Sequence, residues 1–294
     1  METDRSKICG CKGIRTCLKC EQLFNIQPKY QQILSTDSAY FYCHLCDLCW
    51  PGWNCSDHSN HTGEPIRLEG VHLIENFISK EEETQLISDL DSLPWEFSQS
   101  GRRKQNFGPK CNFKKRKLRA GNFKGFPVCT KFIHEKFKTT DILKDFCTIE
   151  QCTLEYDANR GASIDPHIDD CWIWGERIVT VNLLEDSVLT LTPYQSDDNN
   201  KYNLNFAPEQ YRYGAEKKSA CVQVIRIPLI KRSLLVLTGE ARYCWLHQIY
   251  RQDVPSRRLC LAFREFTPAY LPGGIHSDEG ENILELSKNF WELS

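Results

Sequence analysis

Two histidines and one aspartate have the residue types and the spacing that suit metal chemistry in this 294-residue chain. His167 and Asp169 are separated by one residue in the segment DPHID, and His247 lies far along the chain in ARYCWLHQI. On an extended strand, residues two apart project from the same side. Two imidazoles and one carboxylate can occupy one face of an octahedral Fe(II) and leave the opposite face open. We predict that these three residues bind iron; a chance His-x-Asp pair is the alternative.

Two arginines predict an anion site near this metal. Arg258 and Arg264 are six residues apart in RRLCLAFREF, so both face the same side of an extended strand. A guanidinium inside a β-barrel needs an anionic partner. A dicarboxylate could provide one through a bidentate, charge-assisted bond. The alternative is a structural arginine that pairs with a buried acid such as Asp170 or Glu176.

Half of the 16 cysteines lie close to the N-terminus, between Cys9 and Cys55. The first group is Cys9, Cys11, Cys17 and Cys20, and the second is Cys43, Cys46, Cys49 and Cys55. Four thiolates at such spacing suit a tetrahedral zinc ion, and a segment this short needs metal to fold. We predict zinc at the first group. For the second group, Cys43 or Cys46 could instead complete the first site. An iron–sulfur cluster and an oxidation-prone tail are the remaining alternatives.

A basic stretch between Gly101 and Arg119 is the predicted substrate-binding surface. It contains Arg102, Arg103, Lys104, Lys110, Lys114, Lys115, Arg116, Lys117 and Arg119. Phosphate contacts with such side chains would give salt-sensitive binding, and Phe107 and Phe113 could stack on a base. We single out Arg102, Arg103 and Lys104 as substrate-binding residues. The alternative is a solvated loop.

Six short apolar or β-branched runs predict the elements that position these residues. They are CTIEQCTLEYD, RIVTVNLLE, SVLTLTP, CVQVIRIPLI, RSLLVLTG and RRLCLAFREF. Runs of this kind, separated by turn residues, indicate a sandwich or jelly roll. The fold class that we predict is mainly β with flanking helices. We divide the chain into a Cys-rich N-terminal module, 1–62, and a larger domain, 63–294.

Helices are expected at two places outside these strands. GVHLIENFISKEEETQLISDL predicts a strand and then a helix, which a capping box of Ser79 and Glu82 begins. A short C-terminal helix is expected at about 282–291. The polar segment 196–220 predicts a surface loop between strands.

The composition is that of an ordinary globular protein, with 40% apolar and 26% charged residues and a net charge of −2. No segment approaches the roughly 20 apolar residues that a membrane helix needs. The first residues are polar and do not resemble a secretory signal. We therefore expect a protein of the cytoplasm and nucleus, with its cysteines reduced and with no membrane partner.

Taken together, these motifs resemble the AlkB family of dioxygenases. The resemblance is carried by His167-x-Asp169, His247, Arg258 and Arg264, with the surrounding words SQSGRRKQNFGPK and RSLLVLTGEARYCWLHQI. It covers roughly residues 8–22 and 68–270 and is strongest to one eukaryotic group. It implies a double-stranded β-helix, iron held by the two histidines and Asp169, and 2-oxoglutarate held by Arg258. Arg264 and Tyr156 are implied on the co-substrate side.

The resemblance also implies an activity. Members of the family use O2 and 2-oxoglutarate to oxidise an N-methyl group, which leaves as formaldehyde. The group that this chain resembles is associated with monomethyl-lysine on actin and with actomyosin function in cytokinesis. The overall pI of about 6.5 leans away from dedicated DNA binding. Two alternatives stay open: demethylation of methylated adenine in DNA or another nucleic acid, and a non-catalytic metal-binding scaffold.

Overall fold

The fold is that of a computed structural model. The structure describes residues 5, 8–13, 15–28, 38–54, 57–194, 200–212 and 224–292. Three parts of the sequence predictions lie outside these residues: Cys55, positions 196–199 and 213–220 of the polar segment, and the first three positions of the strand expected at 221–230. Among the described residues, no helix is both long and apolar enough to cross a membrane.

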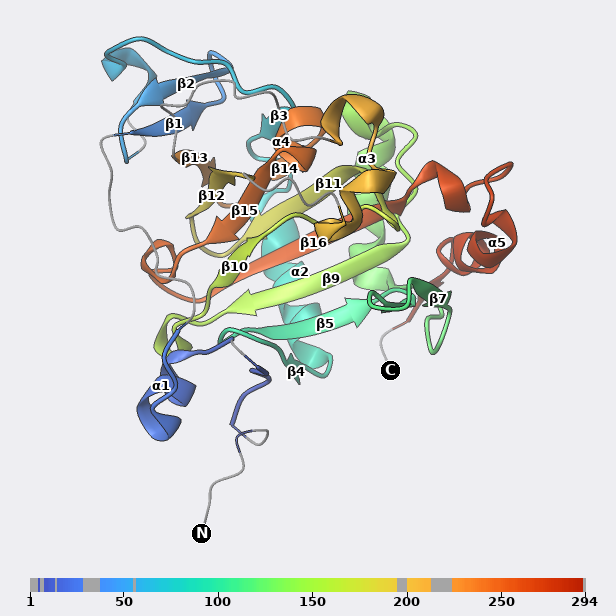
Figure 1. Ribbon diagram of the computed structural model, residues 1–294. Helices are drawn as coiled ribbons and strands as arrows, with labels where there is room; N and C mark the ends of the chain where they lie inside the picture. The colour runs from blue at the N-terminus through green and yellow to red at the C-terminus, as the bar shows by residue number, and fades with distance from the viewer. Residues whose placement is uncertain are drawn as a thin grey trace.

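Two sheets form the body of the protein (Figure 1). The larger sheet has the order β3 (Val71–Ile74), β14 (Leu234–Leu237), β11 (Trp174–Leu183), β16 (Arg258–Phe266), β9 (Glu150–Tyr156), β5 (Arg103–Phe107), β4 (Glu96–Phe97). The smaller sheet has the order β10 (Ile164–His167), β15 (Trp245–Ile249), β12 (Ser187–Pro193), β13 (Val224–Leu229), β1 (Ala39–Cys43), β2 (Leu48–Pro51).

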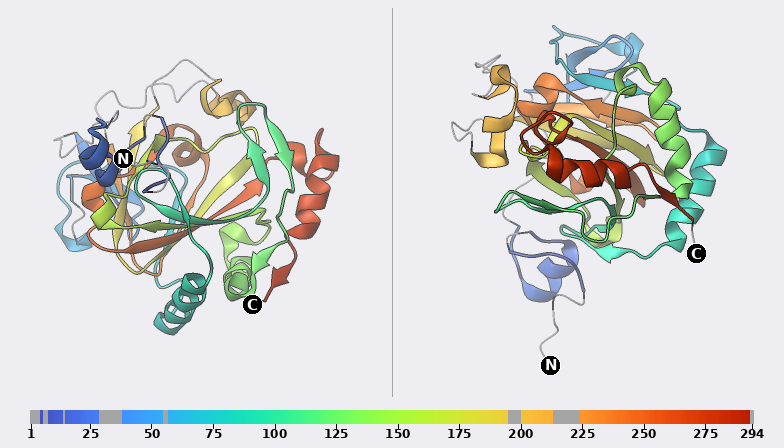
Figure 2. Two further views of the ribbon diagram at one scale, coloured as in Figure 1. Left: turned by 90° about the horizontal axis from the view of Figure 1, so that it is seen from below. Right: turned by 90° about the vertical axis from the view of Figure 1, so that its right-hand side faces the viewer.

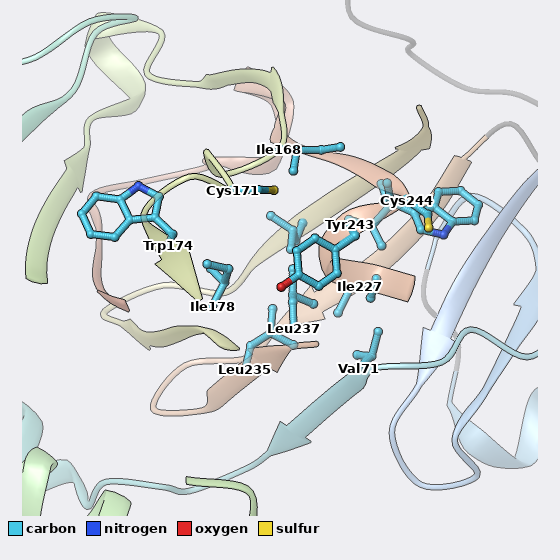
Figure 3. Packing of buried hydrophobic residues seen from close by; sticks show 14 of the residues in the cluster. Val71, Ile168, Cys171, Trp174, Ile178, Ile227, Leu235, Leu237, Tyr243 and Cys244 are labelled. Carbon is cyan, nitrogen blue, oxygen red and sulfur yellow. The ribbon is translucent and has the colours of Figure 1, made fainter. Parts of the chain in front are cut away.

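The strands β9 to β16 form a jelly roll. Along the chain β9, β11, β14 and β16 belong to the larger sheet, whereas β10, β12, β13 and β15 belong to the smaller one. This alternation is that of a double-stranded β-helix, so the predicted fold class is confirmed. Apolar side chains fill the space between the sheets, among them Ile178, Ile227 and Leu237 (Figure 3).

A second apolar layer covers the outer face of the larger sheet. Helices α2 (Lys80–Ser92) and α3 (Lys131–Thr139) pack there, with Leu86 and Phe137 in one cluster with Leu261 and Phe263 of β16 (Figure 2). Alternate residues of β16 therefore face the helices. The intervening positions, which include Arg258 and Arg264, face the interior between the sheets. The predicted common face of the two arginines follows from this alternation.

The remaining elements are short. The helices are α1 (Leu18–Phe24), α4 (Gly239–Tyr243) and α5 (Ser277–Leu286), and the strands are β6 (Lys110–Asn112), β7 (Lys117–Arg119), β8 (Phe126–Pro127) and β17 (Phe290–Trp291). The 3-10 helices are His58–Asn60, Val128–Thr130, Asp141–Leu143, Ala158–Arg160, Lys201–Phe206, Glu209–Tyr211, Arg251–Asp253 and Pro268–Tyr270.

Both predicted helices exist, with different accuracy. The capping box of α2 is confirmed, because the Ser79 hydroxyl accepts from the Glu82 amide and the Glu82 carboxylate accepts from the Ser79 amide. The C-terminal helix α5 begins and ends several residues earlier than expected. Gly280 lies inside it because a Cβ there would come 2.1 Å from the Tyr270 carbonyl oxygen. The chain after α5 pairs β17 with β8 instead.

The two sides of the predicted boundary at residue 62 share a sheet. β1 pairs in parallel with β13, and β2 pairs with β1, so the Cys-rich part contributes the last two strands of the smaller sheet. The division at residue 62 stays a prediction. The basic stretch, which showed no period, holds three strands, β5, β6 and β7.

Candidate functional site

The three predicted iron ligands converge between the two sheets. His167 ends β10 and stands directly opposite His247 of β15 in the antiparallel register, with ring centroids 4.2 Å apart. The Nε2 atom of His167 lies 3.6 Å from the Oδ1 atom of Asp169. One ligand atom from each of the three residues lies within 4.8 Å of the others. This geometry suits a shared metal ion, as predicted from the three residues and the family resemblance.

The surroundings set the protonation that a metal requires. The Nδ1 atom of His167 donates to the Asp165 carbonyl oxygen at 2.8 Å in the ligand-competent tautomer, which leaves Nε2 facing Asp169. Burial lowers the pKa of both His167 and His247. Burial acts to raise the pKa of Asp169, but the Arg264 guanidinium and the two imidazoles outweigh it and hold this pKa below its ordinary value. The site therefore offers two neutral imidazoles and a carboxylate.

Arg264 orients the aspartate of this group. Its Nε atom donates to Asp169 Oδ2 at 2.9 Å, and its Nη1 atom donates to Glu150 Oε2 at 2.6 Å. The predicted alternative partners, Asp170 and Glu176, are not the acids that it contacts. A co-substrate role for Arg264 stays a prediction, and the structure gives it the position of a residue that fixes a metal ligand.

Arg258 meets the requirement for a carboxylate-binding residue. Its side chain is fully buried, and its Nε atom donates to the Asn182 side-chain oxygen at 2.6 Å. Its Nη1 and Nη2 atoms are buried and have no hydrogen-bond partner among the described residues. A buried cation with two unused donors costs free energy until an anion binds it. A carboxylate of 2-oxoglutarate fits this position, so the residues present suit the co-substrate.

Tyr156 lies beside Arg258, as the co-substrate position requires. The two residues are register partners on β9 and β16, and the guanidinium carbon of Arg258 lies 4.8 Å from the centre of the Tyr156 ring. Burial raises the pKa of the Tyr156 hydroxyl, which keeps it a hydrogen-bond donor. The guanidinium carbon of Arg102 lies 5.8 Å from the same ring.

The three predicted substrate-binding residues have different surroundings. Arg102 lies on the Tyr156 side, whereas Arg103 lies on the outer face, where it pairs with Glu155 and stacks on Trp95. Consecutive strand residues face opposite sides, and a substrate-binding role for Arg102, Arg103 and Lys104 stays a prediction. Lys104 opposes Leu154 of β9 in the register and lies 3.9 Å from the Glu96 carboxylate.

Sequence reasoning missed three residues around the metal group. Glu150 holds Arg264, Asn182 holds Arg258, and Arg242 of α4 is buried with a terminal nitrogen that has no partner among the described residues. The Arg242 charge helps to lower the pKa of Asp169 and His247. Of these three residues, only Asn182 could have been noticed in the sequence, because it is a lone amide side chain inside an apolar strand.

The first cysteine group assembles as predicted. Cys9, Cys11, Cys17 and Cys20 are all buried, with one sulfur atom from each within 4.8 Å of the others. Hydrogen bonding from Cys11 is the largest cause that lowers the pKa of Cys17 to about 5. Four sulfur atoms in one buried cluster suit zinc.

The second predicted cysteine group does not form around Cys49. The Cys49 side chain is fully buried in the apolar core between the sheets, while Cys43 and Cys46 lie at the β1–β2 turn. Strand alternation separates Cys49 from that turn, so spacing along the chain was a poor guide to this site.

No protein-family model matches this chain, but named relatives do. Alpha-ketoglutarate-dependent dioxygenase alkB homolog 4 of Mus musculus is 38% identical over 96% of this chain and 94% of its own length. The protein of the same name in Homo sapiens is 39% identical over the same shares. A DNA N6-methyl adenine demethylase of Caenorhabditis elegans is 30% identical over 95% of this chain and 94% of its own length.

A jelly roll that gathers two histidines, one aspartate and a buried arginine with free donors defines a 2-oxoglutarate-dependent dioxygenase. The near-full-length similarity to these relatives identifies the family within this class of enzymes. This chain belongs to the AlkB family, and it resembles the alkB homolog 4 proteins as an oxidative demethylase that depends on iron and 2-oxoglutarate.

Proposed function

We propose that this protein removes the methyl group from monomethyl-lysine in an acidic protein, with actin as the substrate. On this proposal it acts in the cytoplasm and nucleus and supports actomyosin function and cytokinesis. When bound, iron and 2-oxoglutarate supply the oxidising chemistry: O2 and the co-substrate yield succinate and CO2, and the methyl carbon leaves as formaldehyde. The chain itself holds the ligands, orients the co-substrate and receives the methylated side chain.

The observation that carries the proposal is the basic hairpin of β6 and β7. Its Lys114, Lys115 and Arg116 are exposed, and they offer positive charge to an acidic partner. The ring of Phe113, at the turn, contacts Trp172 and Trp174 at centroid distances of 6.3 and 6.5 Å. These tryptophans follow Asp169 closely in the chain. The half-exposed ring of Phe113 suits a methylammonium group, which interacts favourably with aromatic faces.

Methylated adenine in DNA is the second candidate substrate. It is supported by the Caenorhabditis elegans relative, whose name states that activity. The same hairpin would contact phosphates, and Phe113, which is 47% exposed, could stack on a base. The overall pI of about 6.5 leans away from dedicated DNA binding.

Formaldehyde release from defined substrates tests the proposal. The full chain, loaded with Fe(II) and 2-oxoglutarate, would receive an actin peptide with monomethyl-lysine or an oligonucleotide with N6-methyladenine. We expect release from the peptide, none from the oligonucleotide, and none from either with His167→Ala. Release from the oligonucleotide alone would favour the second candidate. Absence of succinate and formaldehyde with either substrate would indicate the non-catalytic scaffold.

A charge-reversal pair tests the role of the hairpin. Lys115→Glu should raise KM for the actin peptide about tenfold and leave KM for 2-oxoglutarate unchanged, because a charge in contact with substrate contributes roughly 1–2 kcal/mol. Lys131→Glu, on the distant helix α3, is the matched control. Equal effects of both variants would exclude the hairpin as a substrate surface.

A further inference from the structure

A third cluster of metal-ligating side chains lies away from the iron group and from the first cysteine group. Cys43, Cys46, His58 and His61 each offer one atom, and these four atoms lie within 4.8 Å of one another. Cys43 ends β1 and Cys46 lies in the turn that follows it, whereas His58 begins the 3-10 helix after β2 and His61 comes directly after that helix. Figure 1 shows this hairpin and α1 at opposite ends of the molecule. We propose that these four residues bind a structural zinc ion.

The distances are those of a common tetrahedral ion. The Sγ atom of Cys43 lies 3.5 Å from Nδ1 of His58, and the Sγ atom of Cys46 lies 3.9 Å from Nδ1 of His61. Zinc bonds of about 2.3 Å to sulfur and about 2.0 Å to nitrogen, at tetrahedral angles, put the two atoms about 3.5 Å apart. Two cysteines and two histidines are also a ligand set that structural zinc uses.

The indole of Trp50 orients one of the two sulfur atoms. Its nitrogen donates to the sulfur of Cys46 at 3.2 Å. A donor of this kind next to a ligand atom fixes its position. Cys49 stays outside the cluster, because it opposes Tyr42 in the β1–β2 register and points into the core.

The surroundings of His61 favour the binding of a metal by this side chain. The ring of His61 packs 4.7 Å from that of Trp50 and 5.5 Å from that of Phe41. Its Nε2 atom is buried and has no hydrogen-bond partner in the described part of the chain. Such a position costs free energy, which a bond from Nδ1 to a metal would offset. His58 lies three residues earlier and is exposed, so it closes the site from the solvent side.

The proposed ion fastens the outermost strands of the smaller sheet. Cys43 ends β1, which pairs with β13, and the two histidines follow β2, the edge strand. The backbone oxygen of Trp53, between β2 and the histidines, accepts from Arg226 of β13. Zinc would therefore tie this returning segment to the hairpin and protect an exposed sheet edge.

Zinc content of the full-length protein tests the proposal. His58→Gln should remove one zinc ion per chain, as should Cys46→Ser, and His58→Cys should restore it. Because the His58 side chain is exposed, its replacement does not endanger the fold. His44→Gln and Cys49→Ala are matched controls and should keep all the zinc, because His44 pairs with Glu75 at 2.8 Å and Cys49 lies in the core.

The ligands of this zinc ion can be identified apart from those of the first cysteine group. In a Cys11→Ser chain, which lacks the first cysteine group, zinc K-edge absorption should show two sulfur and two nitrogen neighbours. Unchanged zinc content in His58→Gln would overturn the proposal. All-sulfur coordination of the remaining zinc, or a disulfide between Cys43 and Cys46 in the purified protein, would also overturn it.

Discussion

Arg258 is the residue whose surroundings are least complete without a small molecule. Asn182 and Tyr156 fix its guanidinium, yet the two terminal nitrogens donate to nothing in the described part of the chain. A side chain that was only structural would satisfy these donors with protein oxygens, as Arg264 does with Asp169 and Glu150. This contrast is the one expected between the predicted co-substrate arginine, Arg258, and an arginine that supports a metal ligand.

Replacing Arg258 should therefore weaken the co-substrate and spare the fold. Arg258→Met removes two charge-assisted bonds worth about 3 kcal/mol together, so KM for 2-oxoglutarate should rise on the order of 100-fold. Succinate formation at varied 2-oxoglutarate measures this. Arg257→Met is the control, because Arg257 pairs with Asp91 and Glu155 on the outer face. A KM within twofold of the unaltered protein would contradict the assignment.

At the scale of residues, the sequence predicted those site residues whose spacing along the chain already indicates a role. The signals were the i, i+2 spacing of His167 and Asp169 and the six-residue spacing of Arg258 and Arg264, which β16 converts into a common face. Glu150, Arg242 and His61 carried no such signal, because each acquires its role from a partner on another element. Convergence across strands depends on register, which spacing along the chain does not contain.

At the scale of elements, some strands could be predicted from the sequence and others could not. β11, β12 and β16 were predictable because most of their positions are buried, so their sequences are rich in apolar and β-branched residues. β5 and β7 were hidden among charges, since their outward positions carry arginine and lysine. β1 is aromatic and buried, but its neighbours are cysteines that indicated a metal module instead.

Helix α3 contains a buried histidine that should make stability depend on pH. His134 packs among Phe126, Phe137 and Phe263, and burial lowers its pKa to about 4 from an ordinary value of 6.5. The unfolded chain therefore binds a proton between these values that the folded chain does not. The contribution of His134 to the free energy of unfolding is fully present above about pH 6.5 and is lost as the pH falls towards 4. At pH 5 the loss is about 2 kcal/mol.

Urea unfolding of the His134→Gln variant isolates this contribution. Glutamine stays neutral, so the free energy of unfolding should decrease by about 2 kcal/mol less between pH 7 and pH 5 than in the unaltered protein. The other titrating groups are common to both chains and cancel in the difference. Parallel pH dependence in the two proteins would show that His134 does not contribute.

At the scale of the whole molecule, the first cysteine group is joined to the segment that precedes the iron ligands. Arg251 holds Glu21 of α1, Arg15 lies 3.4 Å from the carboxylate of Asp165, and Arg160 donates to the Ile8 carbonyl oxygen. Asp165 is two residues before His167, and its carbonyl oxygen orients that ligand. The order of the N-terminal module therefore bears on the order of the iron site.

Loss of metal from the first group should loosen this contact. In Cys11→Ser, amide hydrogen exchange of residues 157–165 should accelerate at least tenfold, because an opening free energy that falls by about 1.4 kcal/mol has that effect. Exchange in α2, on the other side of the larger sheet, should not change. Cys147→Ser, at an exposed cysteine, is the control. Unaltered exchange in 157–165 would show that the two parts are independent.

The parallel pairing of β1 with β13 has a consequence for biosynthesis. Ala39 leaves the ribosome early, but its register partner Val224 is made only after most of the chain. Until then β1 lacks this partner strand, and β13, once made, needs β1 to cover one of its hydrogen-bonding sides. A shortened product that starts at residue 63 would keep that side open permanently, ready to pair with another copy, so it should precipitate where the full-length chain stays dispersed.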